Sequence, residues 1–196
     1  MKVCLWFPPL ADKRGSQLAV CRYLVFKSSL LQFSRVNLDK TQLQLLMPLE
    51  WILKKFYELT PDELYAALQL RNEVFVVEQN CVFQDADGKD QASYHLLGYT
   101  DNKLIAYTRL VPANIIYKEP SIGRVVSSPL VRGTGAGRKL MQESINTAYR
   151  LFGIVPLKIG AQLYLKKFYE SFGFIQVGEG YIEDGIPHIY MVKNPS

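Results

Sequence analysis

The segment from residue 122 to residue 141, IGRVVSSPLVRGTGAGRKLM, constrains the fold of this chain most. It begins with β-branched residues typical of a strand, which ends at Pro129 because proline cannot donate a ladder hydrogen bond. A basic, glycine-rich turn follows. After the turn, apolar residues recur at the spacing of one buried helical face: Met141, Ile145, Ala148 and Phe152. The segment therefore predicts a strand, a tight turn and an amphipathic helix, in that order.

The predicted turn has the properties of an anion-binding site. The first amides of a helix lack partners within the helix and lie at the positive end of its dipole, and glycines let a ligand approach them closely. Neither a Walker P-loop nor a G-x-G-x-x-G fingerprint fits the spacing. On this segment alone, a plain glycine-rich turn that caps a helix explains the pattern equally well. The residues expected to bind the anion are Arg132, Gly133, Thr134, Gly135, Ala136, Gly137 and Arg138.

Two segments resemble signatures of the GNAT superfamily of N-acetyltransferases. Residues 132–137, RGTGAG, resemble its pyrophosphate pattern R/Q-x-x-G-x-G/A, and residues 168–174, FYESFGF, resemble F/L-Y-x-x-x-G-F, whose tyrosine lies beside the coenzyme sulfur. The resemblance implies that Tyr169 protonates the leaving thiolate, which is feasible for a phenol of pKa about 10 and a thiol of pKa about 8.5. A structural alternative stays open, because four residues here also form a core stripe at helical spacing: Leu165, Phe168, Tyr169 and Phe172.

The resemblance extends to the ElaA branch of this superfamily over about residues 48–193. It rests on a set of short segments, at residues 71–79, 87–88, 95–96, 106–110, 122–125 and 183–188. The resemblance implies an α+β fold with a GNAT-like mixed, mostly antiparallel central sheet, flanked by helices and splayed at its central strand. It also implies acetyl-CoA as the cosubstrate. The expected activity is transfer of the acetyl group to a primary amine, by direct attack in a ternary complex.

A helix and a loop are predicted on the N-terminal side of the sheet. Thr60, Pro61 and Glu63 form a capping box with proline at the first helical position, and the helix they open runs towards Glu78. The loop that follows, residues 80–90, contains the sequence DADGKD. An EF-hand would require a ligand at its ninth position and a glutamate at its twelfth, and this loop has Ser93 and Leu96 there. Calcium is therefore disfavoured, and no metal site is expected elsewhere.

Short strands are predicted on both sides of the central strand. Asp101 and Asn102 form a tight hairpin turn between two of them. The expected strands cover residues 50–58, 93–100, 103–111, 157–161, 174–177 and 188–192. A last helix, residues 163–172, is expected to end at Gly173, and residues 178–187 are expected to form a loop. Strands outnumber helices and two hairpins are antiparallel, which favours an α+β class.

Acyl transfer to an amine needs a polarised thioester carbonyl and a deprotonated ammonium group. A splay or bulge in the central strand would free backbone amides for the carbonyl, and we assign Val125, Val126 and Ser127 to this part of cofactor binding. Glu78 and His95 are the catalytic candidates for the deprotonation, although a lone histidine is more often structural. The expected substrate-binding residues are Arg124, Glu183, Asp184 and His188.

Charged residues near this site have alternative interpretations. Arg124 lies on the central strand and needs a partner for its charge, for which Glu78 and Asp184 are candidates. Such a pair is as compatible with a structural role as with catalysis. Acidic residues of the loops would suit a cationic acceptor, although a solvated loop face explains them nearly as well: Glu78, Asp85, Asp87, Glu183 and Asp184.

The charge of the chain is concentrated at its N-terminus. The 196 residues carry a net charge of +5, and residues 1–46 account for all of it, with seven basic and two acidic groups. Residues 47–196 are neutral and are expected to form the GNAT domain. We expect residues 1–46 to be a basic extension ahead of a start at Met47, with an organellar transit peptide as the alternative. The expected compartment is the cytoplasm, or an organelle if the extension is a transit peptide.

The expected partner is a primary amine, of a small molecule or a peptide. Because the domain is neutral and no apolar run approaches eighteen residues, neither nucleic acid nor membrane is expected as a partner. The three cysteines lie far apart and indicate neither a disulfide scaffold nor a zinc site. The sequence leaves a homodimer open. The alternative function is a non-catalytic acyl-CoA-binding regulatory module, and a weaker one is nucleic-acid binding through the basic extension.

Overall fold

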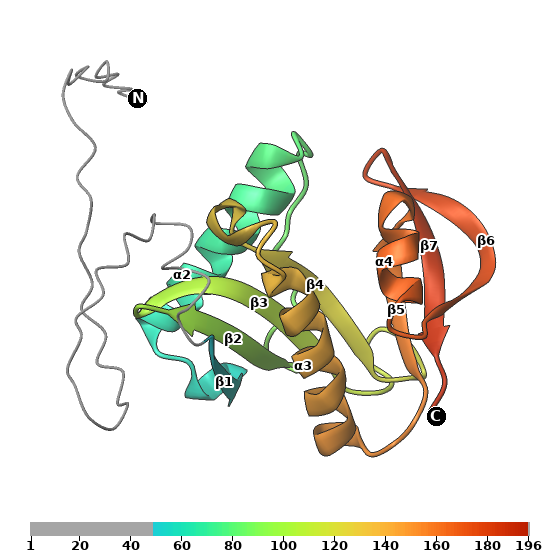
Figure 1. Ribbon diagram of the computed structural model, residues 1–196, viewed down its shortest axis with the longest axis horizontal. Coiled ribbons are helices and arrows are strands. Elements are labelled where there is room, and N and C mark those ends of the chain that lie inside the picture. The colour runs from blue at the N-terminus through green and yellow to red at the C-terminus, as the bar shows by residue number, and fades with distance from the viewer. Residues whose placement is uncertain (1–48, 196) are drawn as a thin grey trace, which may run out of the picture. The chain divides into compact units, whose positions relative to one another are not determined.

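The computed structural model describes residues 49–195, which form a seven-stranded sheet with helices on both faces (Figure 1). The sheet order is β1-β2-β3-β4-β5-β7-β6, and every neighbouring pair is antiparallel except β4 and β5. The strands are β1 (Glu50–Lys55), β2 (Tyr94–Thr100), β3 (Lys103–Val111), β4 (Ser121–Ser127), β5 (Leu157–Gln162), β6 (Ile175–Glu183) and β7 (Ile186–Lys193). The α-helices are α2 (Pro61–Arg71), α3 (Ala136–Phe152) and α4 (Lys166–Glu170), and a π-helix, Asn72–Glu78, continues α2.

Side chains of β3 alternate between two helical layers. Thr108 and Leu110 face α3, where the Thr108 hydroxyl lies 2.9 Å from that of Ser144 and Leu110 joins the core. Tyr107 faces the other way and packs with Leu70 of α2. Successive side chains of a strand point to opposite faces, so α2 and α3 cover opposite faces of this half of the sheet.

Local predictions are confirmed at three places. The hydroxyl of Thr60 accepts a hydrogen bond from the Glu63 amide at 3.2 Å, and the Glu63 carboxylate accepts one from the Thr60 amide at 2.8 Å. Asp101 and Asn102 have φ values of 51° and 56°, the left-handed conformation of a two-residue hairpin turn. Gly173 has φ 84° directly after the last helical turn.

The predicted element boundaries are wrong at three places. The first strand ends at Lys55, and Phe56–Glu58 form a 3₁₀ turn. The helix expected over residues 163–172 divides into a 3₁₀ turn, Leu163–Leu165, and α4. Most of the loop expected over residues 178–187 is strand, because β6 and β7 pair again beyond a bulge and only Asp184 and Gly185 form the turn. Glycines in this segment suggested a loop, but they mark the irregular part of an edge strand.

The sheet is splayed beside its central strand, as predicted. β4 and β5 form one register pair, Ser121 with Lys158, and then separate. On its other side β4 carries a bulge, since two residues of β4 lie opposite one residue of β3 between Tyr107 and Arg109. Arg124 lies in this bulge with φ 52°. The expected α+β, GNAT-like mixed sheet with flanking helices is confirmed.

The glycine-rich turn begins α3 as expected. Gly133 and Gly135 have φ values of 76° and 83°, which only glycine adopts without strain, and Gly135 is the N-cap residue. Ala136 is the first helical residue. The predicted apolar stripe of α3 is buried at Met141, Ile145 and Ala148. The turn therefore lies between the end of β4 and a helix whose apolar face is buried.

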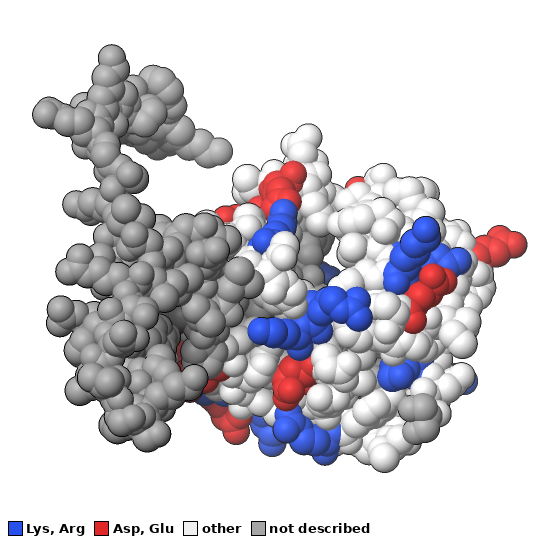
Figure 2. Space-filling view, in the orientation of Figure 1, with Lys and Arg blue, Asp and Glu red and all other residues white. Residues whose placement is uncertain are grey.

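The expected extension, residues 1–46, lies outside the described residues. Among residues 49–195, no helix combines the length and the apolar character that spanning a bilayer demands. Basic and acidic side chains are interspersed over the visible face of the described domain (Figure 2).

Gly98 in β2 has no space for a side chain. A Cβ there would lie 2.5 Å from Cζ3 of Trp51 and 3.1 Å from the Cβ of Ala106. We expect Gly98→Ala to lower the free energy of unfolding by about 1–3 kcal/mol, the usual cost of overpacking, measured by urea denaturation. Gly123→Ala is the control, because a Cβ at Gly123 would meet no atom within 4 Å. Equal losses in both variants would contradict this packing.

Candidate functional site

A cavity of about 700 Å³ opens where β4 and β5 separate. One wall consists of the π-helix, the loop after it and β4. The other consists of β5, the start of the segment leading to α4, and the turn between β6 and β7. Most of the predicted site residues line this cavity: Glu78, Arg124, Val125, Val126, Ser127, Arg132, Tyr169, Glu183, Asp184 and His188.

Arg132 and Glu78, which were expected to serve the coenzyme and the amine separately, form an ion pair. The guanidinium donates from Nη1 to Oε1 and from Nη2 to Oε2, the second bond at 2.8 Å. Both side chains are more than two-fifths exposed. The hydrogen bond from Arg132 lowers the pKa of Glu78 from its ordinary value. The pair joins the end of the π-helix to the start of the glycine-rich turn across 54 residues of sequence.

The glycine-rich turn itself lies beyond the cavity lining, directly after Arg132. A Cβ built at Gly133, Gly135 or Gly137 would meet no atom within 4 Å, so the surface over the turn is open to a ligand. Thr134 donates its hydroxyl hydrogen to the Val131 carbonyl at 2.7 Å, which tightens the turn from inside. An open glycine surface at the N-terminus of a long helix fits a bound pyrophosphate.

Arg138 connects the first turn of α3 to the end of α4. Its Nη1 donates to the Ser171 hydroxyl at 3.0 Å, and its guanidinium lies 4.8 Å from the ring centre of Phe172. The residue therefore holds the glycine-rich turn close to the second signature segment. This contact brings the two sequence signatures together in space, although the chain separates them.

Tyr169 is buried on α4 and lines the cavity. Its ring packs edge-on against Phe168 and Phe174, at centroid distances of 5.1 and 6.2 Å. Burial raises the pKa of the phenol, and Tyr164 adds to the shift. The side chain is therefore neutral at physiological pH, and its protonated phenol lies beside the cavity. The alternative that Tyr169 is a core residue of an apolar helical stripe also holds in part, because Tyr169 belongs to the hydrophobic core cluster.

His95 lies outside the cavity lining, on β2. Its Nδ1 is 2.7 Å from the Tyr107 hydroxyl, and its Nε2 is 3.0 Å from the Asp90 carbonyl. Burial lowers the pKa of the imidazole from its ordinary value. This placement departs from the expected role in deprotonating the amine, because neither ring nitrogen is left to reach the cavity. His95 instead ties β2 to β3 and to the loop before β2.

The remaining substrate-side candidates come together at the other wall of the cavity. Glu183 and Asp184 sit at the turn between β6 and β7, and His188 follows on β7. Nδ1 of His188 lies 2.8 Å from the Ile186 carbonyl, and the imidazole ring packs beside Tyr181. Glu183 and Asp184 form no ion pair within residues 49–195.

Arg124 has partners that the sequence did not indicate. Its Nε donates to Oδ1 of Asp85 at 2.6 Å, and its Nη2 donates to the Asp85 carbonyl at 3.1 Å and to Oδ2 of Asp87 at 3.4 Å. The expected partners, Glu78 and Asp184, make no ion pair with it. Asp85 and Asp87 were expected to face solvent or a cationic acceptor. They are instead engaged by arginines.

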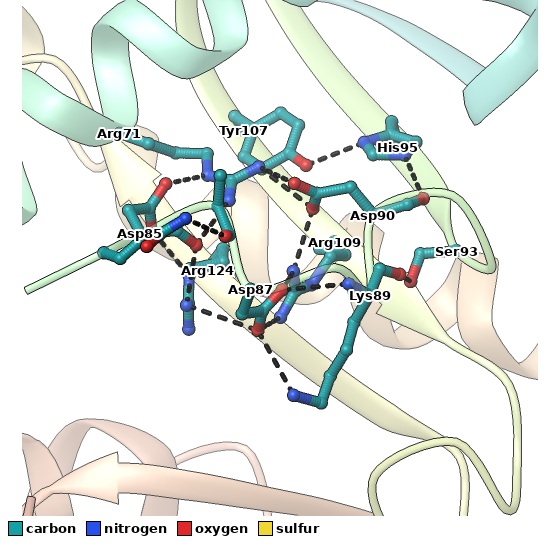
Figure 3. A network of polar contacts seen from close by, with 12 residues as sticks. Arg71, Asp85, Asp87, Lys89, Asp90, Ser93, His95, Tyr107, Arg109 and Arg124 are labelled. Carbon is teal, nitrogen blue, oxygen red and sulfur yellow. Dashed lines mark hydrogen bonds and ion pairs between the residues drawn. The ribbon is translucent and has the colours of Figure 1, made fainter.

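These contacts belong to a larger buried network of alternating charges (Figure 3). Arg71 binds Asp85 at 2.7 Å and Asp90 at 3.0 Å, and Arg109 binds Asp90 at 2.8 Å and both oxygens of Asp87 at 2.6 and 2.7 Å. Arg71 and Arg109 are each 1% exposed. The network fastens the loop before β2 to α2, β3 and β4, and that loop forms part of the cavity wall.

The protonation states of the network follow from its geometry. Burial alone would raise the pKa of Asp87, but the hydrogen bonds and charge of Arg109 outweigh burial and hold that pKa well below its usual range. The pKa of Asp90 is lowered in the same way, by Arg109 and Arg71 against the opposing effect of burial. The carboxylates therefore stay ionised. Among residues 49–195, no group of His, Cys, Asp and Glu could hold a metal ion.

A signal for this network exists in the sequence. Three aspartates lie within six residues of one loop, and Arg71 and Arg109 occupy positions within a helix and a strand, each next to a leucine. A buried arginine needs a carboxylate. The local pattern could not indicate which arginine meets which aspartate, since the pairs span 14 to 39 residues.

A mixed sheet that splays at its central strand, with a glycine-rich turn before the next helix, defines a GNAT-fold acyltransferase. Residues 59–195 match the family model of the acetyltransferase (GNAT) domain, and the chain belongs to this family. The family transfers acyl groups from acyl-CoA, so an acyl-CoA is the cosubstrate of this protein.

The similar proteins place the chain in the ElaA-like branch of the family. It is 45% identical to a UPF0039 protein of Synechocystis and 44% identical to protein ElaA of Escherichia coli, each over 147 residues that cover 74% of this chain and 96% of the relative. The crystal structure of Escherichia coli ElaA superposes with a TM-score of 0.71 at 43% identity, covering 75% of this chain and 100% of that one. An acyl-CoA N-acyltransferase from Pseudomonas aeruginosa superposes with a TM-score of 0.72 at 44% identity, covering 74% and 99%.

The buried network predicts that replacing a buried arginine destabilises the protein far more than replacing an exposed one. Arg109→Met leaves Asp87 and Asp90 with fewer partners, so we expect the free energy of unfolding to fall by about 3–5 kcal/mol in urea denaturation. Arg150→Met is the matched control. It removes an arginine that is 66% exposed and paired with Glu143, for which the expected loss is below about 1 kcal/mol. Similar losses in the two variants would show that the network does not stabilise the fold.

Proposed function

We propose that the protein is an acetyl-CoA-dependent N-acetyltransferase that acetylates a primary amine by direct attack in a ternary complex. The observation that carries this proposal is the opening between β4 and β5, where Arg132 of one GNAT signature and Tyr169 of the other line the same cavity. We assign the activity to the expected domain, residues 47–196. Membership of the family supports acyl transfer, and the choice of acetyl and of a primary amine is our proposal.

In this proposal the pyrophosphate of the cosubstrate is held by residues 132–138. The open surface over Gly133, Gly135 and Gly137 supports this role, because backbone amides at the start of α3 can approach an anion there without obstruction. Arg132 contributes a cation that now binds Glu78. A pyrophosphate carries more charge than one carboxylate and would compete for the same guanidinium. Binding of the cosubstrate would therefore release Glu78 into the cavity.

The reaction forms a bond between the amine nitrogen and the acyl carbon and breaks the carbon–sulfur bond. Those backbone amides of residues 125–127 that face the β5 side are proposed to stabilise the carbonyl oxygen, since this edge of β4 has no ladder partner there. The ammonium group gives up two protons. Glu78 is proposed to take the first, because His95 has no free nitrogen. The Tyr169 phenol supplies a proton to the thiolate, and the second proton of the attacking nitrogen restores the phenol. The net reaction therefore releases one proton, the one that Glu78 takes.

Calorimetric titration with acetyl-CoA tests the coenzyme site. We expect the wild type to bind acetyl-CoA and Arg132→Glu to lose binding. Glu78→Gln removes the competing carboxylate, so we expect it to bind acetyl-CoA up to about fivefold more tightly, the equivalent of one exposed ion pair. Glu179→Gln, an exposed change on β6, is the control. Absence of binding to the folded wild type would refute the proposed function, and weaker binding by Glu78→Gln would refute the competition.

Turnover tests the role of Tyr169. In a thiol-release assay with acetyl-CoA and an accepted amine, we expect Tyr169→Phe to lower kcat by about 100-fold, the usual size of a lost general acid. The phenyl ring preserves the packing with Phe168 and Phe174, so acetyl-CoA affinity should not change. Full turnover by Tyr169→Phe would rule out the proton transfer. Binding of acetyl-CoA without turnover of any amine would instead support the non-catalytic acyl-CoA-binding module.

A further inference from the structure

Two cations of the buried network reach the cavity. Arg71 and Arg109 are enclosed, whereas the side chains of Arg124 and Lys89 are 24% and 39% exposed. Both line the cavity. In Figure 3 the Arg124 guanidinium and Lys89 Nζ both lie next to the Asp87 carboxylate, which joins them. The network therefore presents its spare hydrogen-bond donors to the space where an acceptor would enter.

The charges of the network do not balance. Four cations, Arg71, Arg109, Arg124 and Lys89, meet three carboxylates, those of Asp85, Asp87 and Asp90. Each carboxylate is shared by at least two cations, and Asp87 is shared by three. The surplus positive charge lies where solvent reaches the network, at Arg124 and Lys89. This wall of the cavity is therefore cationic in spite of the three aspartates in the loop.

Each of the two cations has donors to spare. Arg124 uses Nε and Nη2, and its Nη1 makes no hydrogen bond within residues 49–195. Nζ of Lys89 lies 3.8 Å from Oδ2 of Asp87, beyond hydrogen-bond distance. The Arg124 side chain and the Lys89 backbone are nevertheless held in place. The guanidinium of Arg124 packs over Phe83, and the Lys89 amide donates to Asp87 at 3.1 Å.

The opposite wall carries the opposite charge. Glu183 and Asp184 line the cavity from the turn between β6 and β7, and they form no ion pair within the described part of the chain. His188 also lines the cavity, from β7. A cavity with one cationic and one anionic wall is complementary to a zwitterion.

We propose that the acceptor is an amino carboxylate, a molecule that bears a carboxylate close to the amine that is acetylated. Arg124 and Lys89 bind the carboxylate. The ammonium group lies between Glu78, once the cosubstrate has released it from Arg132, and Glu183, Asp184 and His188. Arginine offers paired donors that match a carboxylate, and lysine adds a point charge. This inference rests on the proposed function and specifies its substrate class. A free amino acid is the simplest member of the class.

Matched substrates test the inference. The thiol-release assay is run with acetyl-CoA and pairs that differ in the carboxylate alone, namely tyrosine with tyramine, histidine with histamine and lysine with cadaverine. We expect the wild type to favour at least one amino acid over its amine by about tenfold or more in kcat/KM, chiefly through KM. Lys89→Gln is expected to reduce that preference by about tenfold. Lys103→Gln, an exposed lysine of β3 outside the cavity, is the matched control and should leave the preference unchanged.

Each outcome of the assay decides the inference. Faster turnover of the amines than of the amino acids would overturn it and leave the proposed function intact, as would equal slowing of both members of a pair by Lys89→Gln. Absence of turnover in both series would overturn it as well. In that case the calorimetric titration with acetyl-CoA shows whether the proposed coenzyme site has failed or only the acceptor assignment.

Discussion

The contact between Arg124 and Asp85 sets the shape of the site. Arg124 occupies a left-handed conformation in a bulge of β4, which is unfavourable for a residue with a side chain. The Asp85 carboxylate and carbonyl hold its guanidinium at 2.6 and 3.1 Å. The bulge lies in the part of β4 that separates from β5, so the same short stretch both interrupts the sheet and lines the cavity.

The network around this contact is stable only as a whole. Burying Arg71 and Arg109 would be very costly without partners, and each finds carboxylates from a loop that has no regular structure of its own. The loop in turn depends on the arginines, because they hold Asp87 and Asp90 in their ionised form. Such mutual dependence gives the loop one defined position beside the cavity. An irregular segment can therefore form a precise wall of a binding site.

Elements that depend on neighbouring residues could be predicted from the sequence. The capping box at Thr60, the hairpin turn at Asp101 and the glycine-rich turn before α3 are short-range patterns, and each has the expected form. Element boundaries were less accurate where an edge strand contains glycines, since pairing with β7 overrides the local preference of β6. His95 shows that the positions of site residues also depend on contacts between distant parts of the chain. Its distance from the cavity follows from contacts with Tyr107 and Asp90 that no local pattern encodes.

The sequence by itself determined the fold class, the order of the main elements and the acyl-CoA signatures, because these depend on periodicity and on short motifs. Only the tertiary structure decided which charges meet. It paired Arg132 with Glu78 across 54 residues and Arg124 with Asp85 across 39. It also brought Tyr169 to the cavity beside Arg132. Ion pairs of this kind depend on the packing of distant elements and on burial, and neither quantity can be read from spacing along the chain.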